Sequence, residues 1–564
     1  LVKNAVLDAE RSVDRKFKEA ILAVRLEDQL GKEGVLERYL NTVYFGQSAY
    51  GVQAAAERFF GKSLADLTVP EAALLAGLIA SPEHYNPFDY PERAKTRRAA
   101  VLQRMVAEGY LSKPQADAFA LAPLPTEARQ VLPTDDTYFV AEVKRQLLAD
   151  ERLGRTKKER AQRLFRGGLQ VKTTFDPRLQ QLARLAVEAN SPSPDFTQAV
   201  VALDPNNGGV RAVVGGRGFA EQKFNVATQG PRQPGSAFKV IALAAWIDAG
   251  HSPDDWVDAT APCEFPVPNG TWKVSNYDDG TGSLMTLREA THQSSNCAYA
   301  RLALTLGPDR IAAMAKRLGV SRPLPAFPSI VLGGEEVTPL EMATVAATLA
   351  SDGVRHAPLW VTEVRDAKGS LVLENEPKGE QVISPDTARA VNSVMQGVVQ
   401  LGTGKAAQLD RPVAGKTGTA QQWTDAWFVG WTKELATAVW MGSPAGKVPM
   451  RGVGGRNVTG GSFPAQTFAV FMQPALAGLP AQQFAPPSVL PPPGWVGLPP
   501  QDVVDWLNFF AAHGITVPGV PPLPPEVAIT PAQTPPPPPG DSTTSGTSTE
   551  PASEPRSKRA KPGD

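Results

Sequence analysis

The sequence predicts a multidomain protein with an α-helical N-terminal part, an α+β domain and a proline-rich, largely disordered tail. Its 564 residues exceed the usual domain length of about 100–200, and 42% of them are hydrophobic, enough for extensive cores. Apolar residues follow a helical period near the N-terminus, strand-like runs begin near residue 199, and proline dominates the end of the chain. We therefore expect domains at residues 1–122 and 196–475, a linker at 123–195 and a tail at 476–564.

Helical patterns are clearest at two places in the N-terminal part. From Arg15 to Leu40, apolar residues recur every three or four positions, which predicts a helix. Thr68-Val69-Pro70-Glu71 is typical of a helix start, because its Thr and Glu side chains can satisfy each other's backbone N–H groups. The helix that follows, to Ile79, is apolar nearly all round. This favours a buried core helix, and the alternative is a surface that dips into lipid.

Strand and helix patterns continue through the expected linker into the α+β domain. The runs 199–203 and 210–214 flank a turn-forming Asp-Pro-Asn-Asn-Gly-Gly segment, which predicts a β-hairpin. The tail cannot bury enough apolar area to offset its ordering entropy, apart from one short helix. The remaining expected elements are helices at Tyr138–Leu148, Pro177–Ala189 and Asp502–Ala512 and a strand at Leu169–Thr174.

Composition excludes several classes of function. The net charge is zero, so nothing favours nucleic acid as a partner. No run reaches the ~18 apolar residues that span a bilayer, and the start at Leu1, without methionine, leads us to expect an internal fragment. One bridge between Cys263 and Cys297 is possible, but two unpaired buried thiols are expected. The five scattered histidines, without a CxxC or HExxH pattern, favour neither a metal site nor a Ser-His-Asp triad.

The first chemical motif is Ser236-Ala-Phe-Lys239, where an extended stretch gives way to an apolar helix. Residues three apart share a helix face, so the lysine lies one turn beyond the serine. The helix N-terminus favours negative charge on the serine oxygen. A lysine in an apolar pocket loses its proton more easily, and the neutral amine can then serve as a general base. Alone, the motif is weak, since a capping serine and a surface lysine would give the same pattern.

Two further motifs supply polar groups for the same site. Ser294-Ser-Asn296 places a hydroxyl, able to relay a proton, beside an amide that can bind a substrate carbonyl. The segment from Lys416 to Thr419 follows a strand pattern and pairs with a second strand around Trp427–Trp431. In it, Lys416 and Thr417 can hold a carboxylate, Gly418 permits close approach, and the Thr419 N–H can serve as an oxyanion donor.

The order S-x-x-K, S-x-N, K-T-G resembles that of penicillin-binding proteins, specifically the bifunctional class A type. The resemblance covers residues 196–475, including Leu332–Met342 and Gly402–Lys405, and Lys172–Gln180 looks like the family's inter-domain linker. It implies a β-lactamase-like fold and a D,D-transpeptidase that needs no cofactor. Ser236 would attack the penultimate D-Ala carbonyl of a stem peptide, with Lys239 as base, Ser294 as proton shuttle and the Ser236 and Thr419 N–H groups as oxyanion hole. β-Lactams should acylate the same serine.

The N-terminal part resembles the C-terminal portion of a lysozyme-like peptidoglycan glycosyltransferase, which polymerises lipid II. Three segments match its motifs: Arg15-Lys16-Phe17-Lys18-Glu19, Leu36–Gly46 (with Asn41) and Arg97–Met105. The resemblance assigns Glu19 to catalysis, and Arg15, Lys16 and Asn41 to substrate binding. It also implies a divalent cation for the full-length family, a membrane-spanning helix, and a location on the extracytoplasmic face of the cell membrane.

The glycosyltransferase family's first catalytic glutamate and its membrane helix have no match in this sequence. We therefore expect a polypeptide of these residues not to polymerise lipid-linked disaccharide. Losing a general base typically costs ~10²–10⁴-fold in rate.

Three alternatives stay open. A β-lactamase or D,D-carboxypeptidase would use water as acceptor, but such enzymes generally lack the glycosyltransferase-like block. A catalytically silent wall-binding or sensor protein is disfavoured by the intact Ser236, Lys239 and Lys416. Cys297 as nucleophile is the third, suggested only by its place beside the S-x-N motif.

Overall fold

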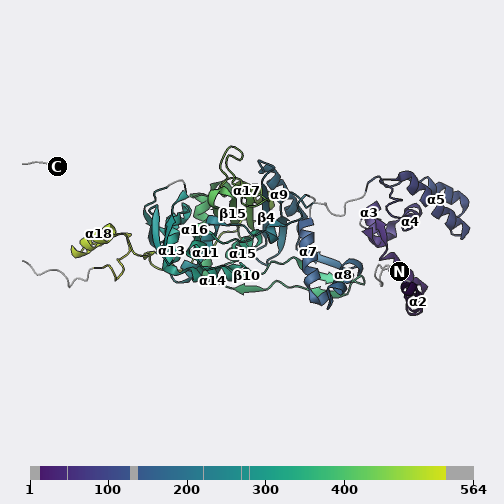
Figure 1. The fold of residues 1–564 in the computed structure, drawn as a ribbon, viewed down its shortest axis with the longest axis horizontal. Helices are drawn as coiled ribbons and strands as arrows, with labels where there is room; N and C mark the ends of the chain where they lie inside the picture. Colours follow the sequence, from purple (N-terminus) through teal and green to yellow (C-terminus); the bar gives the residue numbers. More distant parts are fainter. Residues whose placement is uncertain are drawn as a thin grey trace, which may run out of the picture. The chain divides into compact units, whose positions relative to one another are not determined.

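The structure is a computed structural model that describes residues 13–47, 49–127, 137–219, 221–268, 270–277 and 280–528 (Figure 1). Within it, residues up to 498 form one compact unit and those from 499 onward a second. We treat these two units separately.

The N-terminal part is helical, as predicted. The long helix α2 is interrupted at Gly31, whose φ of 67° is left-handed, so the single helix expected from Arg15 to Leu40 is wrong at this point. The capping box at Thr68 is present, and its backbone N–H donates to Glu71 Oε2 at 2.8 Å. The elements are α2 (Val13–Leu40), β1 (Tyr44–Gly46), β2 (Ala49–Tyr50), α3 (Val52–Phe60), η1 (Leu64–Asp66), α4 (Val69–Leu78), α5 (Pro91–Ala107) and α6 (Lys113–Ala120).

Helix α4 is a core helix and not an exposed lipid-facing surface. Leu74, Leu75 and Leu78 are each at most 2% exposed. Leu75 and Leu78 belong to an apolar cluster that also holds Phe45 and Phe59. This decides between the two alternatives that the sequence left open.

The stretch expected as a linker is folded into the next domain. Tyr138 and Phe139 of α7 lie in its largest apolar core, and Ala183 of α9 lies in a second core. The predicted helix Pro177–Ala189 has the same bounds in the structure. The elements are α7 (Thr137–Ala149), η3 (Glu151–Leu153), α8 (Lys157–Arg166), β3 (Gln170–Thr173) and α9 (Pro177–Ala189).

A five-stranded antiparallel sheet organises the α+β domain, in the order β14-β15-β16-β4-β5. The predicted hairpin 199–203 and 210–214 is its β4–β5 pair, and the expected K-T-G hairpin is its β14–β15 pair. These strands are β4 (Thr197–Leu203), β5 (Val210–Val214), β14 (Ala414–Thr419), β15 (Asp425–Trp431) and β16 (Ala436–Gly442).

Helices cover both faces of this sheet (Figure 1). Strand β4 shows the consequence, since all seven of its residues are buried. Its Val200 and Ala202 pack into the core with α9 and α17 (Phe463–Ala475), whereas Val201 packs into the core with α11 (Lys239–Asp248) and α15 (Pro339–Ala350). Strand side chains alternate between faces, so a strand covered on both sides is apolar throughout.

The other elements connect or flank these layers, and β11 and β12 form a small sheet with β3. They are α10 (Val226–Gln229), η4 (Gly235–Phe238), α11 (Lys239–Asp248), β6 (Trp256–Asp258), β7 (Cys263–Val267), β8 (Gly270–Val274), β9 (Leu284–Thr286), α12 (Leu287–His292), α13 (Asn296–Leu306), α14 (Pro308–Leu318), η6 (Pro328–Leu332), α15 (Pro339–Ala350), β10 (Val354–His356), β11 (Val361–Arg365), β12 (Leu371–Glu374), β13 (Gly379–Gln381), α16 (Pro385–Gln400), η7 (Lys405–Ala407), η8 (Gln421–Trp423) and α17 (Phe463–Ala475).

The disorder expected from residue 476 does not hold for the beginning of the tail. The Gly494 N–H donates to Asp255 Oδ1 at 2.6 Å, and Val496, 1% exposed, donates its N–H to the Trp256 carbonyl at 2.8 Å. The Asp255 side chain and the Trp256 backbone thus satisfy backbone groups of this extended segment. In the second unit the expected short helix is present as α18 (Gln501–Ala512). Residues 529–564 lie outside the described range.

None of the helices in the described ranges is both long and apolar enough to cross a membrane.

Candidate active site

Ser236 lies in a tight 3₁₀ turn, η4, directly before helix α11. Gly235 has a φ of +53°, and a Cβ on it would lie 2.5 Å from the Thr419 carbonyl oxygen. Only glycine therefore lets the serine turn press against strand β14. Ser236 itself is half-buried and lines a cleft.

Lys239 is the first residue of α11, and its side chain is fully buried. Its Nζ donates to the Ser294 carbonyl at 2.7 Å and to Asn296 Oδ1 at 2.7 Å. Burial lowers the pKa of Lys239 well below its usual value, and the charge of nearby Lys416 lowers it further. A neutral amine has two N–H donors and one lone pair. With both donors used on α13 and its preceding turn, the lone pair remains to accept a proton.

Ser294 and Asn296 lie at the turn between α12 and α13. Ser294 lies within this turn, and Asn296 is the first residue of α13. Ser294 has a left-handed φ of 59°, a conformation that non-glycine residues adopt rarely and mostly at functional turns. The preceding cap, Ser295, accepts a hydrogen bond from the Ala298 N–H at 3.3 Å. This arrangement points the Ser294 carbonyl and the Asn296 amide at one lysine.

Lys416 reaches the same turn from strand β14. Its buried Nζ donates to Ser294 Oγ at 2.8 Å and to the Thr417 carbonyl at 3.1 Å. Burial lowers the pKa of Lys416 to about 7. The Ser294 hydroxyl therefore lies beside the Lys416 amine, which changes between its neutral and ammonium forms near neutral pH.

Gly418 and Thr419 bring strand β14 against the serine turn. A Cβ on Gly418 would lie 2.1 Å from the Pro234 carbonyl oxygen, so the predicted need for close backbone approach is confirmed. Thr419 Oγ1 accepts the Gly460 N–H at 3.2 Å. Thr417 Oγ1 lies 2.7 Å from Thr403 Oγ1.

The three motifs thus meet in one cleft of about 1190 Å³. Ser236, Ser294 and Asn296 form one wall with polar groups, and Thr417 and Thr419 line the strand side. Aromatic and basic residues also line the cleft: Trp272, Lys273, Tyr277, Trp423 and Arg456.

For most of the predicted glycosyltransferase residues, the structure describes the backbone but not the side chain. The side chains of Arg15, Lys16 and Glu19 lie outside the described residues, although all three belong to the backbone of helix α2. Asn41 follows the end of that helix and is exposed, with its N–H bonded to the Glu37 carbonyl at 3.0 Å. In the part of the chain that the structure describes, no group of three or more His, Cys, Asp or Glu residues could hold a metal ion.

The expectation of two unpaired thiols is wrong, because Cys263 and Cys297 form a disulfide. The first residue of β7 and the second residue of α13 are 34 positions apart in sequence. The β7–β8 hairpin pairs Cys263 with Val274 and so returns the chain to α13. Both sulfurs lie near the Val274 carbonyl, at 3.6 and 3.5 Å. Since Cys297 is bonded in this way, a nucleophilic role for it has no support.

Sequence reasoning also missed two residues that support the site, Thr403 and Asn276. Thr403 lies in the Gly402–Lys405 segment, which was noted without a role. Asn276 follows strand β8, and its side chain accepts hydrogen bonds from the start of α13. A polar residue at the end of a strand gives little sequence signal, because surface turns have the same composition.

The two lysines predict a bell-shaped pH dependence for acylation. As a general base, Lys239 would act only as the neutral amine, so the rate should rise with pH through its lowered pKa. As an anion-binding group, Lys416 would act only as the ammonium, so the rate should fall above about pH 7. Measuring kcat/KM, or the second-order rate of penicillin labelling, from pH 4 to 10 tests this. Lys416→Arg should remove the fall at high pH, since arginine stays charged; an unchanged descending limb would contradict the assignment.

Comparisons with known proteins agree with this geometry. The chain matches the penicillin binding protein transpeptidase domain over residues 198–445 and the transglycosylase family over residues 1–106. Penicillin-binding protein 2D of Bacillus subtilis is 33% identical over 500 residues, which cover 86% of this chain and 70% of that protein. Penicillin-binding protein 1A of Mycobacterium tuberculosis is 33% identical over 564 residues, covering 92% of this chain and 67% of that protein.

Solved structures show the same fold. Penicillin-binding protein 1A from Haemophilus influenzae has a TM-score of 0.65 and 23% identity, over 81% of this chain and 87% of that one. PonA1 from Mycobacterium tuberculosis, in complex with penicillin V, has a TM-score of 0.57 and 31% identity. It covers 65% of this chain and all (100%) of that one.

Fold, site and relatives together define a penicillin-binding transpeptidase domain in the same chain as a transglycosylase domain. The chain belongs to the class A, bifunctional penicillin-binding proteins and functions in peptidoglycan synthesis. This family acts on peptidoglycan substrates, binds β-lactams and is associated with the membrane.

Proposed function

We propose that the chain is a D,D-transpeptidase that cross-links stem peptides through an acyl-enzyme on Ser236. The observation that carries this is the position of Lys239. Its buried amine is held by Ser294 and Asn296 one helical turn from Ser236. Burial and the nearby charge of Lys416 favour the neutral form of this lysine, and a neutral amine is the base that a serine nucleophile needs.

The first half-reaction forms the acyl-enzyme. Lys239 Nζ takes the Ser236 hydroxyl proton while Oγ bonds to the penultimate D-Ala carbonyl carbon. The backbone N–H groups of Ser236 and Thr419 stabilise the oxyanion, a contribution typically worth 10²–10³-fold or about 3–4 kcal/mol per donor. The close contact of Gly418 with the serine turn supports this pairing, because it holds strand β14 against the turn that carries Ser236.

Collapse of the oxyanion breaks the C–N bond and releases D-alanine. The proton that Lys239 took passes through the Ser294 hydroxyl to the leaving nitrogen, while Lys416 Nζ donates a hydrogen bond to Ser294 Oγ at 2.8 Å. An amine of a neighbouring stem then attacks the acyl carbon. Lys239 takes the proton that this amine loses and returns it to the Ser236 oxygen as the ester C–O bond breaks. Asn296 holds a carbonyl of the donor stem, while Lys416, Thr417 and Thr419 bind its terminal carboxylate.

For the N-terminal part we propose glycan polymerisation from lipid II by the full-length protein, on the extracytoplasmic side of the membrane. Glu19, with Arg15 and Lys16, would act near the pyrophosphate, and Asn41 would contact the substrate. Among the described residues, no cluster of three or more His, Cys, Asp or Glu side chains could hold a divalent cation.

A donor-and-acceptor assay tests the transpeptidase proposal. The chain is incubated with a stem pentapeptide ending in D-Ala-D-Ala, with and without an acceptor stem amine. Release of D-alanine together with a cross-linked dimer is expected. Release with hydrolysed tetrapeptide alone, at any acceptor concentration, would instead identify a D,D-carboxypeptidase.

A further inference from the structure

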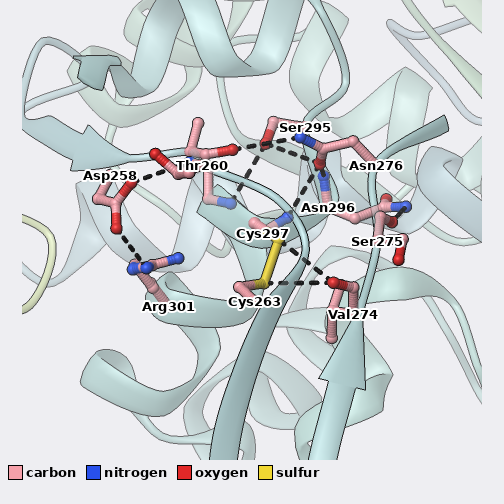
Figure 2. The surroundings of a disulfide bond; sticks show 12 residues. Asp258, Thr260, Cys263, Val274, Ser275, Asn276, Ser295, Asn296, Cys297 and Arg301 are labelled. Atoms are coloured by element: carbon pink, nitrogen blue, oxygen red, sulfur yellow. Dashed lines mark hydrogen bonds and ion pairs between the residues drawn. A yellow bond between two sulfur atoms is a disulfide. The ribbon is translucent and has the colours of Figure 1, made fainter. Parts of the chain in front are cut away.

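The β7–β8 hairpin forms a wall of the cleft, to which it contributes Trp272 and Lys273. The segment after it, Ser275 and Asn276, runs alongside the first turn of α13 (Figure 2). The Ser275 carbonyl accepts the Asn296 side-chain N–H at 2.8 Å. This wall therefore contacts Asn296, whose side-chain oxygen accepts the hydrogen bond from Lys239.

Asn276 makes most of that connection. Its Oδ1 accepts hydrogen bonds from the N–H groups of Asn296 and Cys297, at 2.8 and 3.2 Å, and from Ser295 Oγ at 3.2 Å. The first N–H groups of a helix have no partner within the helix. In α13, the Asn276 side chain from another segment is the acceptor for two of these N–H groups. Asn276 Nδ2 in turn donates to the Ala259 carbonyl at 3.2 Å, which fixes which way the amide points.

The disulfide ties the same two segments together a second time. Cys297 follows Asn296 directly, and Cys263 begins the hairpin that leads to Asn276 (Figure 2). Arg301, one turn further along α13, also pairs with Asp258 at the end of β6. The hairpin and the helix start are thus joined by one covalent bond and a set of hydrogen bonds, all within a few residues of Asn296.

We propose that Asn276 is a positioning residue for acylation and that the Cys263–Cys297 disulfide keeps it in place. Asn276 fixes the first turn of α13. This turn sets the Asn296 Oδ1 atom, and Asn296 Oδ1 orients the Lys239 amine toward Ser236. The inference rests on the proposed acyl-transfer function. It adds a residue that does not act on the reacting atoms but determines the geometry of the base.

Two substitutions at Asn276 separate this role from general stability. Asn276→Ala leaves three donors without their acceptor, so the limiting acylation rate with fluorescent penicillin should fall about tenfold to a hundredfold. Asn276→Asp keeps an acceptor oxygen and adds a negative charge at a helix N-terminus, where it is favourable. It loses the hydrogen bond to the Ala259 carbonyl, so it should acylate more slowly than wild type but several-fold faster than Asn276→Ala.

Ser384→Ala is the matched control. Ser384 caps α16 through the Thr387 N–H at 3.0 Å, so its loss also removes a helix cap, but it does not line the cleft. Thermal melting of all variants is measured in parallel. If Asn276→Ala acylates at the rate of Ser384→Ala while both are folded, or if Asn276→Asp is as slow as Asn276→Ala, the positioning role is refuted.

Reduction tests the tether. A water-soluble phosphine takes an oxygen from water to become a phosphine oxide, and the two sulfurs become thiols with the two protons. The reduced wild type should acylate several-fold more slowly. The acylation rate of Asn276→Ala should fall little further on reduction, because the disulfide and Asn276 both position the first turn of α13. An unchanged wild-type rate after complete reduction, verified by thiol alkylation and mass, would refute the tether. Wild-type labelling on a residue other than Ser236 would instead refute the proposed function.

Discussion

Ser236→Ala is expected to abolish covalent labelling of the chain by penicillin while leaving its fold unchanged. The substitution removes only the Oγ atom of a half-buried residue in a turn whose shape is set by Gly235 and β14. Without that oxygen no ester can form, and turnover of stem peptide should fall by more than about 10³-fold. Gel fluorescence with a labelled penicillin measures the first effect and D-alanine release the second.

Ser329→Ala provides the control for this variant, because Ser329 lines the same cleft but belongs to none of the three motifs. It should label at a rate close to that of the unmodified chain. Equal labelling of Ser236→Ala and Ser329→Ala would remove Ser236 from the mechanism.

Lys239→Arg should slow acylation by about 10²–10⁴-fold, the usual contribution of a general base. Arginine keeps the positive charge but does not deprotonate in proteins. The rate should therefore also lose its rise with pH, because no neutral base is available at any accessible pH. Stopped-flow or quenched labelling between pH 5 and 10 measures both effects.

Position 239 is fully buried, so the larger arginine side chain can disturb packing. Lys239→Gln, which is shorter and neutral, is made in parallel and should be as slow while melting near wild type. Lys433→Arg is the matched control, since Lys433 pairs with Asp352 at 3.3 Å away from the cleft. Near-normal acylation by both position 239 variants would exclude Lys239 as the base.

Much of the fold follows from local patterns. The helix Pro177–Ala189 has the predicted bounds because Asp176 caps it and Pro177 begins it. The hairpins β4–β5 and β14–β15 follow from apolar runs on either side of turn segments. These features depend on residues that are neighbours in sequence.

Of the features that were missed, one depends on the backbone conformation of a single residue and the others on tertiary contacts. Gly31 breaks α2 through its own backbone conformation, which a periodic apolar pattern does not report. The segment around Gly494 hydrogen-bonds to Asp255 and Trp256, which are more than 200 residues away in sequence. In the folded chain the β7–β8 hairpin holds Cys263 next to Cys297, 34 residues further along.

The candidate site shows the same division. Motif order grouped Ser236, Lys239, Ser294, Asn296 and Lys416 into one site. In the structure Ser236, Ser294 and Asn296 line one cleft, and the buried Lys239 and Lys416 both hydrogen-bond to Ser294. The sequence could not show that the Ser294 carbonyl is one of the two acceptors for Lys239, or that Asn276 holds the turn. Those contacts cross 55 and 20 residues of chain and leave no periodic pattern.

Mapping the acyl adduct by mass spectrometry tests the central claim most directly. The chain is quenched in acid during turnover of a D-Ala-D-Ala stem peptide and, separately, after treatment with penicillin, and each sample is digested and sequenced. We predict that both adducts lie on the Ser236 oxygen and that each excludes the other in competition. An adduct on any other residue, or different residues for the two ligands, would contradict a single acyl-transfer site at Ser236.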